Sequence, residues 1–126
     1  MGGHEAMTVR RAIGIGAASA ARLEDVLVLV RTTVGRFDDV CLATIDRRAD
    51  LAAAVAKALD LELRLFSADE LAAVPGTVTP SSRSVAAVGS PSVAEAAALA
   101  ALGPGARLVQ PRRTGILCTC ALAELP

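Results

Sequence analysis

The residues most suited to chemistry begin in a glycine-containing segment near the N-terminus. Residues 12–25, AIGIGAASAARLED, read as the end of a strand, a glycine turn and the start of a helix. Gly14 and Gly16 carry no side chain that would block a close approach to the backbone, and Ser19 can cap the helix by accepting a hydrogen bond from an amide two or three residues on. Because a helix N-terminus offers free N–H donors, we expect this turn to form one wall of an anion-binding site. A tight strand-to-helix turn would need the same residues for structural reasons alone.

Two arginine pairs and several hydroxyl groups follow the other predicted strands. In open α/β sheets, ligands bind outside the carboxyl ends of the strands. Arginine is well suited to hold carboxylates and phosphates, because its planar guanidinium forms two parallel hydrogen bonds with them. We therefore expect this edge of the sheet to bind a polyanion. The expected binding residues are Gly14, Gly16, Ser19, Arg47, Arg48, Ser67, Arg112, Arg113 and Thr114.

Carboxylates are the candidates for acid–base chemistry, because His4 is the only histidine in the chain. The candidate acids are Asp46, Asp50, Glu70 and Glu95. Glu95 is the only charge in an alanine-rich helix, so it is either a catalytic group or a solvent-facing charge that keeps the helix soluble. We take Glu95 and Asp46 as the candidate catalytic residues.

The same glycines partly imitate a dinucleotide-binding fingerprint. Gly14-x-Gly16-x-x-Ser19 lacks the third glycine, and Asp46 lies beyond the spacing of about 20 residues expected for the acidic residue that binds ribose. A nucleotide-binding module is therefore kept as an alternative.

Three cysteines, Cys41, Cys118 and Cys120, are present. An odd number without framework spacing is typical of a reducing cytoplasm. Cys118 and Cys120 share one face if they lie on a strand. Small buried cysteines are the more common arrangement, so we expect neither a metal site nor a cofactor.

Alternating strands and helices must position these residues. The pattern predicts a three-layer α/β/α fold with a mostly parallel five-stranded sheet and one antiparallel strand at the C-terminus. A capping box, Ser67 with Glu70, predicts the start of a short helix, and the alanine-rich helix must be largely covered by other elements. The strands are expected at residues 8–15, 39–45, 61–66, 107–110 and 116–122, and the helices at residues 20–34, 46–60, 68–74, 80–88 and 90–102.

Composition narrows the domain organisation and the partners. The chain has 126 residues, of which 53% are hydrophobic and 2% aromatic, with zero formal net charge. We expect residues 1–7 to be a disordered leader and residues 8–126 to be a single domain. Low aromatic content and zero charge argue against nucleic-acid binding, and no stretch approaches the roughly 18 apolar residues of a membrane span. Arg10 and Arg11 superficially resemble a twin-arginine signal, but the following apolar run is short and broken by glycine, so we expect a cytoplasmic protein.

Five stretches in order resemble the family of CobE and the C-terminal domain of CbiG from cobalamin biosynthesis. They are AIGIG, LATIDRRAD, LRLFSADELAAV, VGSPSVAEAAAL and ARLVQPRRTGILCTCALA, which together cover most of residues 12–123. In this family CbiG resembles a two-part protein that acts as cobalt-precorrin-5A hydrolase, opening a ring lactone and releasing acetaldehyde. The present chain corresponds to the C-terminal part alone and is more similar to free-standing CobE.

The chain departs from the family pattern at several positions. Ala17 and Ala18 stand where the family usually has a cysteine and a basic residue, Arg48 replaces a lysine, and Leu51 replaces an acid. The basic residue that precedes the last strand is matched by Arg112 or Arg113.

The resemblance implies a protein that binds a polycarboxylate corrinoid or precorrin intermediate. It would assist processing at the ring-contraction stage or carry the intermediate between enzymes. A second hypothesis is hydrolysis of the ring lactone with acetaldehyde release, using Glu95 or Asp46. A nucleotide-binding module is the third, and a non-catalytic partner of another enzyme of the pathway is the fourth.

Overall fold

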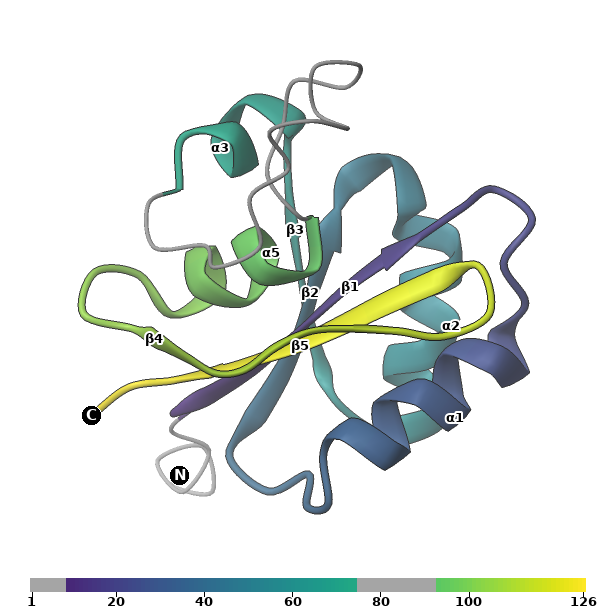
Figure 1. Ribbon diagram of the computed structural model, residues 1–126, viewed down its shortest axis with the longest axis horizontal. Helices are drawn as coiled ribbons and strands as arrows, with labels where there is room; N and C mark the ends of the chain where they lie inside the picture. Colours follow the sequence, from purple (N-terminus) through teal and green to yellow (C-terminus); the bar gives the residue numbers. More distant parts are fainter. Residues whose placement is uncertain (1–8, 75–92) are drawn as a thin grey trace, which may run out of the picture.

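The computed structural model of the chain describes residues 9–74 and 93–126, which form a five-stranded sheet with helices on both faces (Figure 1). The predicted leader, the predicted helix at residues 80–88 and the predicted helix start at Ser90 lie outside the described residues. The strands are β1 (Arg11–Ala17), β2 (Val40–Ile45), β3 (Glu62–Phe66), β4 (Arg107–Thr114) and β5 (Cys118–Glu124). The helices are α1 (Leu23–Thr33), α2 (Ala49–Leu59), α3 (Ala68–Ala72) and α5 (Val93–Leu102), with a 3-10 turn, η2 (Asp46–Arg48), before α2.

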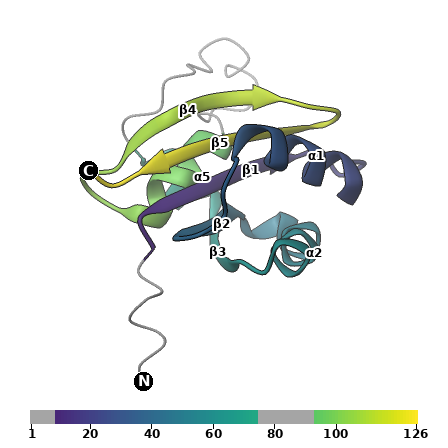
Figure 2. The same ribbon diagram turned by 90° about the horizontal axis from the view of Figure 1, so that it is seen from below.

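The sheet is mixed, with strand order β3-β2-β1-β5-β4. β1 pairs in parallel with β2, and β2 with β3, whereas β5 is antiparallel to both of its neighbours, β1 and β4. Figure 2 shows β5 between those two strands. The predicted antiparallel C-terminal strand is confirmed by β5, but the sheet is not mostly parallel, because this strand lies inside the sheet and makes two antiparallel pairings.

Side chains alternate along β1 between two apolar clusters on opposite faces of the sheet. Ile13 and Ile15 contribute to a cluster that includes Val26 and Val30 of α1 and Val55 of α2. The other cluster contains Ala12, Leu71 of α3 and the alanines of α5. Every residue of β2 is buried, which confirms the interpretation of its continuous apolar run.

Alanine-rich α5 lies directly on the sheet. Seven of its residues are buried, which confirms that a helix with so few polar groups is covered. A Cβ atom at Gly14 would lie 1.8 Å from the carbonyl oxygen of Ala94 and 2.7 Å from the amide nitrogen of Ala98. The core of this face is therefore built by close backbone approach between a glycine in β1 and alanines in α5.

Helix α3 begins as the sequence predicts. The Ser67 hydroxyl accepts a hydrogen bond from the Glu70 amide (3.1 Å), and the Glu70 carboxylate accepts one from the Ser67 amide (2.7 Å). This confirms the capping box.

Among the described residues, no helix is long and apolar enough to cross a membrane.

Candidate functional site

Four strands of the sheet end at the same edge, because β1, β2, β3 and β4 run in one direction. The chain leaves β1 through α1 on one face and returns to β4 through α5 on the other. The carboxyl end of β1 is thus a topological switch point, the place where open α/β sheets bind ligands. We use the name carboxyl edge for the last residues of these strands and the residues that follow them, together with the start of α5: residues 16–19, 46–48, 67, 112–117 and 93–95.

Arg48 links two strand ends at the carboxyl edge. The turn η2 follows β2, and its Arg48 Nε donates a hydrogen bond of 2.7 Å to the carbonyl oxygen of Ala17, the last residue of β1. The side chain is half-buried, whereas Asp46 and Arg47 beside it are exposed. The guanidinium of Arg48 is therefore held at the switch point by its hydrogen bond to the backbone of β1.

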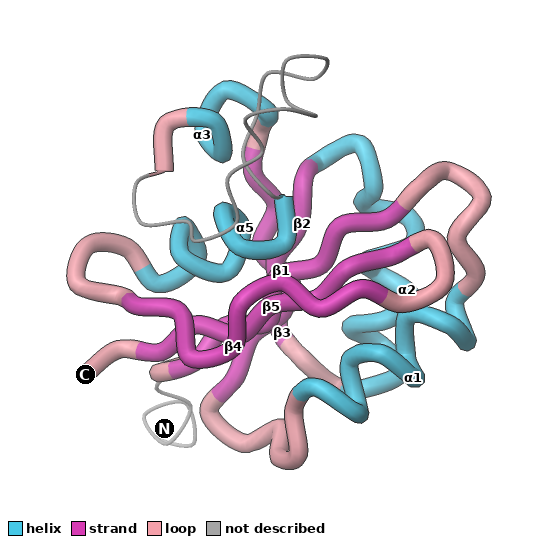
Figure 3. Tube along the Cα trace, viewed as in Figure 1, coloured by secondary structure: helices cyan, strands magenta, loops and turns pink. Residues whose placement is uncertain are grey.

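The loop between β4 and β5 lies against the end of β1 (Figure 3). The amide of Ala18 donates to the carbonyl oxygen of Leu117 (2.9 Å), and the amide of Gly115 donates to that of Cys118 (2.8 Å). Leu117 has φ 61°, an uncommon backbone conformation for leucine. Ile116 and Leu117 are 65% and 52% exposed, so this loop presents two apolar side chains at the carboxyl edge.

Sequence reasoning missed this apolar loop. It placed residues 116 and 117 in the last strand and residues 111–115 in a turn, whereas β4 extends to Thr114 and β5 begins at Cys118. The reason is that Pro111 interrupts β4 without ending it: the pairing with β5 shifts between Leu108 and Gln110 and again between Gln110 and Arg113, as at β-bulges. An apolar pair directly after Gly115 was the available signal.

Arg112, Arg113 and Thr114 are all exposed on β4, the strand at the edge of the sheet. Arg113 lies directly opposite Cys120, which belongs to the core cluster under α1. Because opposed residues of antiparallel strands share a face, the side chain of Arg113 starts on the α1 face of the sheet.

Gly16 and Ser19 differ from the predicted arrangement. Gly14 lies within β1, as the strand expected at residues 8–15 implies, but it is covered by the backbone of α5, and Gly16 also lies within β1 rather than in the turn after it. Ser19 lies in the loop after β1 and is exposed, but α1 begins only at Leu23, with Arg22 at its N-cap and no side-chain cap. The prediction that Ser19 caps this helix was wrong, because the loop continues past Ser19 before the first helical turn. Gly14 therefore lacks the position that a dinucleotide fingerprint requires.

The two candidate catalytic acids have very different surroundings. Glu95 in the first turn of α5 is 0% exposed, which rules out the solvent-facing alternative. Its Oε2 atom accepts a hydrogen bond of 2.9 Å from the backbone amide of Arg112. Asp46 is exposed at the start of η2. Of the remaining two acids, Asp50 is exposed on α2 and Glu70 completes the capping box of α3.

The three cysteines are free thiols in the core, as expected. Burial raises the pKa of Cys41 to about 11 and that of Cys120 to about 12, and burial also raises the pKa of Cys118. Thiols with such values are protonated near neutral pH and are poor nucleophiles. Within the described part of the chain, no group of three or more His, Cys, Asp or Glu side chains could hold a metal ion.

We predict that the native protein reacts negligibly with a thiol reagent such as dithionitrobenzoate at pH 8, and that all three cysteines react after unfolding in guanidinium. The raised pKa values also predict that the free energy of unfolding decreases as pH rises from about 9 through about 11, because the unfolded chain ionises its thiols first. Fast labelling of one cysteine in the native state would contradict this burial.

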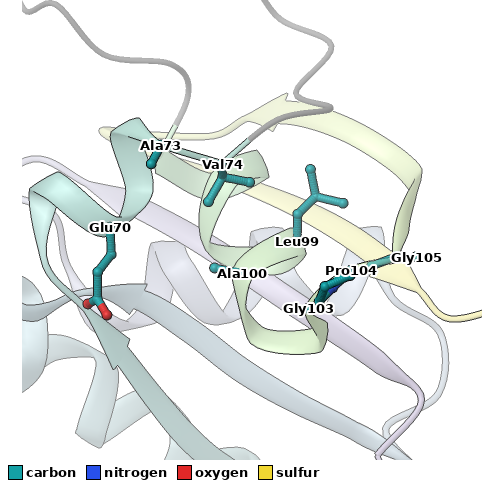
Figure 4. Close-up of a pocket in the computed structure, with 9 residues that line it drawn as sticks. Glu70, Ala73, Val74, Leu99, Ala100, Gly103, Pro104 and Gly105 are labelled. Atoms are coloured by element: carbon teal, nitrogen blue, oxygen red, sulfur yellow. The ribbon is translucent and has the colours of Figure 1, made fainter.

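A cavity of about 330 Å³ lies between α3 and the C-terminal half of α5, extending to the turn at residues 103–106 (Figure 4). That turn precedes the first residue of β4, so this part of the cavity lies toward the amino ends of the strands, whereas Glu70, which is hydrogen-bonded to Ser67, belongs to the helix that follows the carboxyl end of β3. Its lining is apolar apart from Glu70 and backbone groups. It does not include any of the binding residues predicted from the sequence.

Comparison with known proteins gives a consistent result. The profile of the family described as cobalamin synthesis G C-terminus matches residues 11–123. The crystal structure of CobE, a protein from the cobalamin (vitamin B12) biosynthetic pathway, is similar, with a TM-score of 0.78 and 29% identity over 93% of this chain and 91% of that one. The cobalamin biosynthesis protein chiG from Agrobacterium tumefaciens has a TM-score of 0.68 and 34% identity over 91% of this chain and 98% of its own. No curated protein sequence gives a significant match.

Proposed function

This chain belongs to the CbiG C-terminal family of cobalamin synthesis, and from that premise we propose that its carboxyl edge binds a corrin-ring intermediate through the ring's carboxylates. The observation that carries the proposal is the anchored guanidinium of Arg48 at the switch point, beside the exposed apolar loop. Guanidinium groups form strong, charge-assisted hydrogen bonds with carboxylates.

The spread of positive charge favours a large polycarboxylate over a small anion. Arg47 and Arg48 follow β2, and Arg112 and Arg113 lie on β4, which is three strands away in the sheet. At about 4.8 Å for each strand spacing, the two pairs are separated by roughly 14 Å. Corrin precursors carry acetate and propionate groups around the whole ring, so one ligand can reach both pairs.

The apolar loop supplies the second part of the recognition. A corrin ring is polar at its rim and largely apolar on its faces. Ile116 and Leu117 lie between the two arginine pairs in the order of the sheet, because their loop contacts Ala18 after β1. Binding sites for small molecules combine such apolar surface with a few polar groups that fix orientation.

Holding or carrying the intermediate fits these groups better than lactone hydrolysis does. Of the two candidate acids, Glu95 is buried and bonded to a backbone amide, and Asp46 is exposed. We therefore propose that the protein presents the ring to, or receives it from, another enzyme of the pathway. Acetaldehyde release from the lactone intermediate by this chain alone would contradict a purely binding role.

The proposal is tested by titrating the purified chain with cobyrinic acid, a corrin with free acetate and propionate side chains, and following the visible spectrum. We expect saturable binding, which weakens as salt is raised because the carboxylates are held by ionic contacts. NAD is the control ligand and is expected not to bind. Failure to bind the corrin, or preference for the nucleotide, would contradict the proposal.

The loop gives a separate prediction. Ile116→Ala is expected to weaken cobyrinic acid binding about fivefold, because a ligand that covers this side chain gains roughly 1 kcal/mol of apolar burial. Val28→Ala is the matched control, since Val28 is 61% exposed and lies on α1, outside the residues of the carboxyl edge. Equal affinities for the two variants would exclude the loop from the site.

A further inference from the structure

Glu95 occupies an unusual position for a carboxylate: it is fully buried between an alanine helix and the edge strand β4. Its neighbours on α5 are apolar and buried. Burying a charged group is costly unless hydrogen bonds compensate for the lost hydration. One compensating bond comes from the amide of Arg112, 2.9 Å from Oε2.

The bond falls where the ladder between β4 and β5 is irregular. Gln110 pairs with Leu122 and Arg113 pairs with Cys120, so β4 uses three steps where β5 uses two. The two residues of β4 between these pairs are Pro111, which has no amide hydrogen to donate, and Arg112. The Arg112 amide donates to the carboxylate of Glu95, which takes the place of a strand partner.

The position of the carboxylate is fixed by packing below it. The carbonyl oxygen of Ala94, the residue before Glu95, lies 1.8 Å from the position that a Cβ of Gly14 would take, so the backbone of α5 is in close contact with β1 at this point. The first turn of α5 therefore packs on β1 and is joined to the bulge of β4 by the bond between Glu95 and the Arg112 amide.

We propose that Glu95 is a positioning residue: its buried carboxylate holds the bulge of β4 through the Arg112 amide and so sets the direction in which Arg112 and Arg113 leave the strand. This inference rests on the proposed corrin site, because positioning matters only if these arginines bind a ligand. It assigns Glu95 a role in holding the backbone and not in proton transfer.

Two variants separate reach from charge. Glu95→Gln keeps an oxygen at the same reach but removes the charge, whereas Glu95→Asp keeps the charge but is shorter by one carbon–carbon bond, about 1.5 Å. The shortened carboxylate would lie beyond hydrogen-bond distance of the Arg112 amide. We expect Glu95→Gln to bind cobyrinic acid within about threefold of the original chain and Glu95→Asp to bind at least about tenfold more weakly. The reverse order would show that charge, and not reach, is what matters, and would overturn the proposal.

A double-mutant cycle tests whether Glu95 acts through the arginines. In a chain with Arg112→Ala and Arg113→Ala, the further change Glu95→Asp is expected to alter the affinity by less than about twofold, because the groups that it positions are gone. A full and additive loss in that background would overturn the inference. Thermal unfolding of each variant shows whether a weaker affinity reflects a loss of fold.

Hydrogen exchange of the Arg112 amide tests the bond without any ligand. The amide is expected to be protected in the original chain and in Glu95→Gln, and to exchange at least about tenfold faster in Glu95→Asp. If the chain fails to bind cobyrinic acid while this pattern holds, the proposed function fails and the positioning of the bulge stands. An Arg112 amide that exchanges freely in the original chain would overturn the positioning itself.

Discussion

Replacing Gly14 with alanine is expected to lower the free energy of unfolding by at least about 3 kcal/mol, the upper part of the range for overpacked cores. The added methyl carbon would be placed 1.8 Å from the carbonyl oxygen of Ala94 and 2.7 Å from the amide nitrogen of Ala98. Both are backbone atoms of α5, so no side chain can rotate away to make room. The helix must move off β1 and separate the alanines of this face from the sheet. Because small domains are stable by only about 5–15 kcal/mol, this loss is a large fraction of the total stability.

Urea unfolding followed by circular dichroism measures this effect. Gly35→Ala is the matched control, because a Cβ there would meet nothing within 4 Å and the position is exposed. We expect the control to change the free energy of unfolding by no more than about 0.5 kcal/mol. If Gly14→Ala were as stable as this control, α5 could not lie on β1 as described.

The second large effect is expected at the arginines. Arg48→Ala is predicted to weaken cobyrinic acid binding about 10- to 100-fold, because a hydrogen bond to a charged group contributes about 1.5–3 kcal/mol. Arg112→Ala is predicted to have a smaller effect, since its side chain is more exposed than that of Arg48. Arg48→Lys keeps the charge but loses the planar fork, so its affinity should fall between that of Arg48→Ala and that of the original chain.

Arg107→Ala and Arg31→Ala are the controls for these variants. Arg107 lies on β4 at the end opposite Thr114 and pairs with Glu124 on the surface. Arg31 is exposed in the last turn of α1. Both remove one positive charge, as the test variants do, so they separate a local contact from the effect of net charge. Equal losses of affinity in the test and control variants would mean that the carboxyl edge is not the binding site.

Local signals in the sequence predicted several elements correctly. The continuous apolar run of β2 indicated a strand buried on both faces, and the spacing of Ser67 and Glu70 indicated a helix start. Each of these features depends on residues that are close in the chain. The alanine-rich composition of α5 also indicated correctly that the helix is covered.

Contacts between distant segments could not be predicted in the same way. Gly14 was interpreted as a residue that opens the backbone to a ligand, but its role depends on α5, about eighty residues later in the chain. Pro111 was interpreted as the start of a turn, but it lies in a bulge of β4 in which the amide of Arg112 donates a hydrogen bond to Glu95. The exposed Ile116 and Leu117 became visible only when β5 was found to begin at Cys118.

The most direct test of the central claim is the location of the bound corrin. Amide chemical shifts of the labelled protein should be followed by NMR during titration with cobyrinic acid. We predict that the largest changes occur at the carboxyl edge, at Ala17, Ala18, Arg48 and Leu117. Changes confined to the cavity between α3 and α5, around Val74 and residues 103–106, would contradict the account, as would the absence of any saturable change.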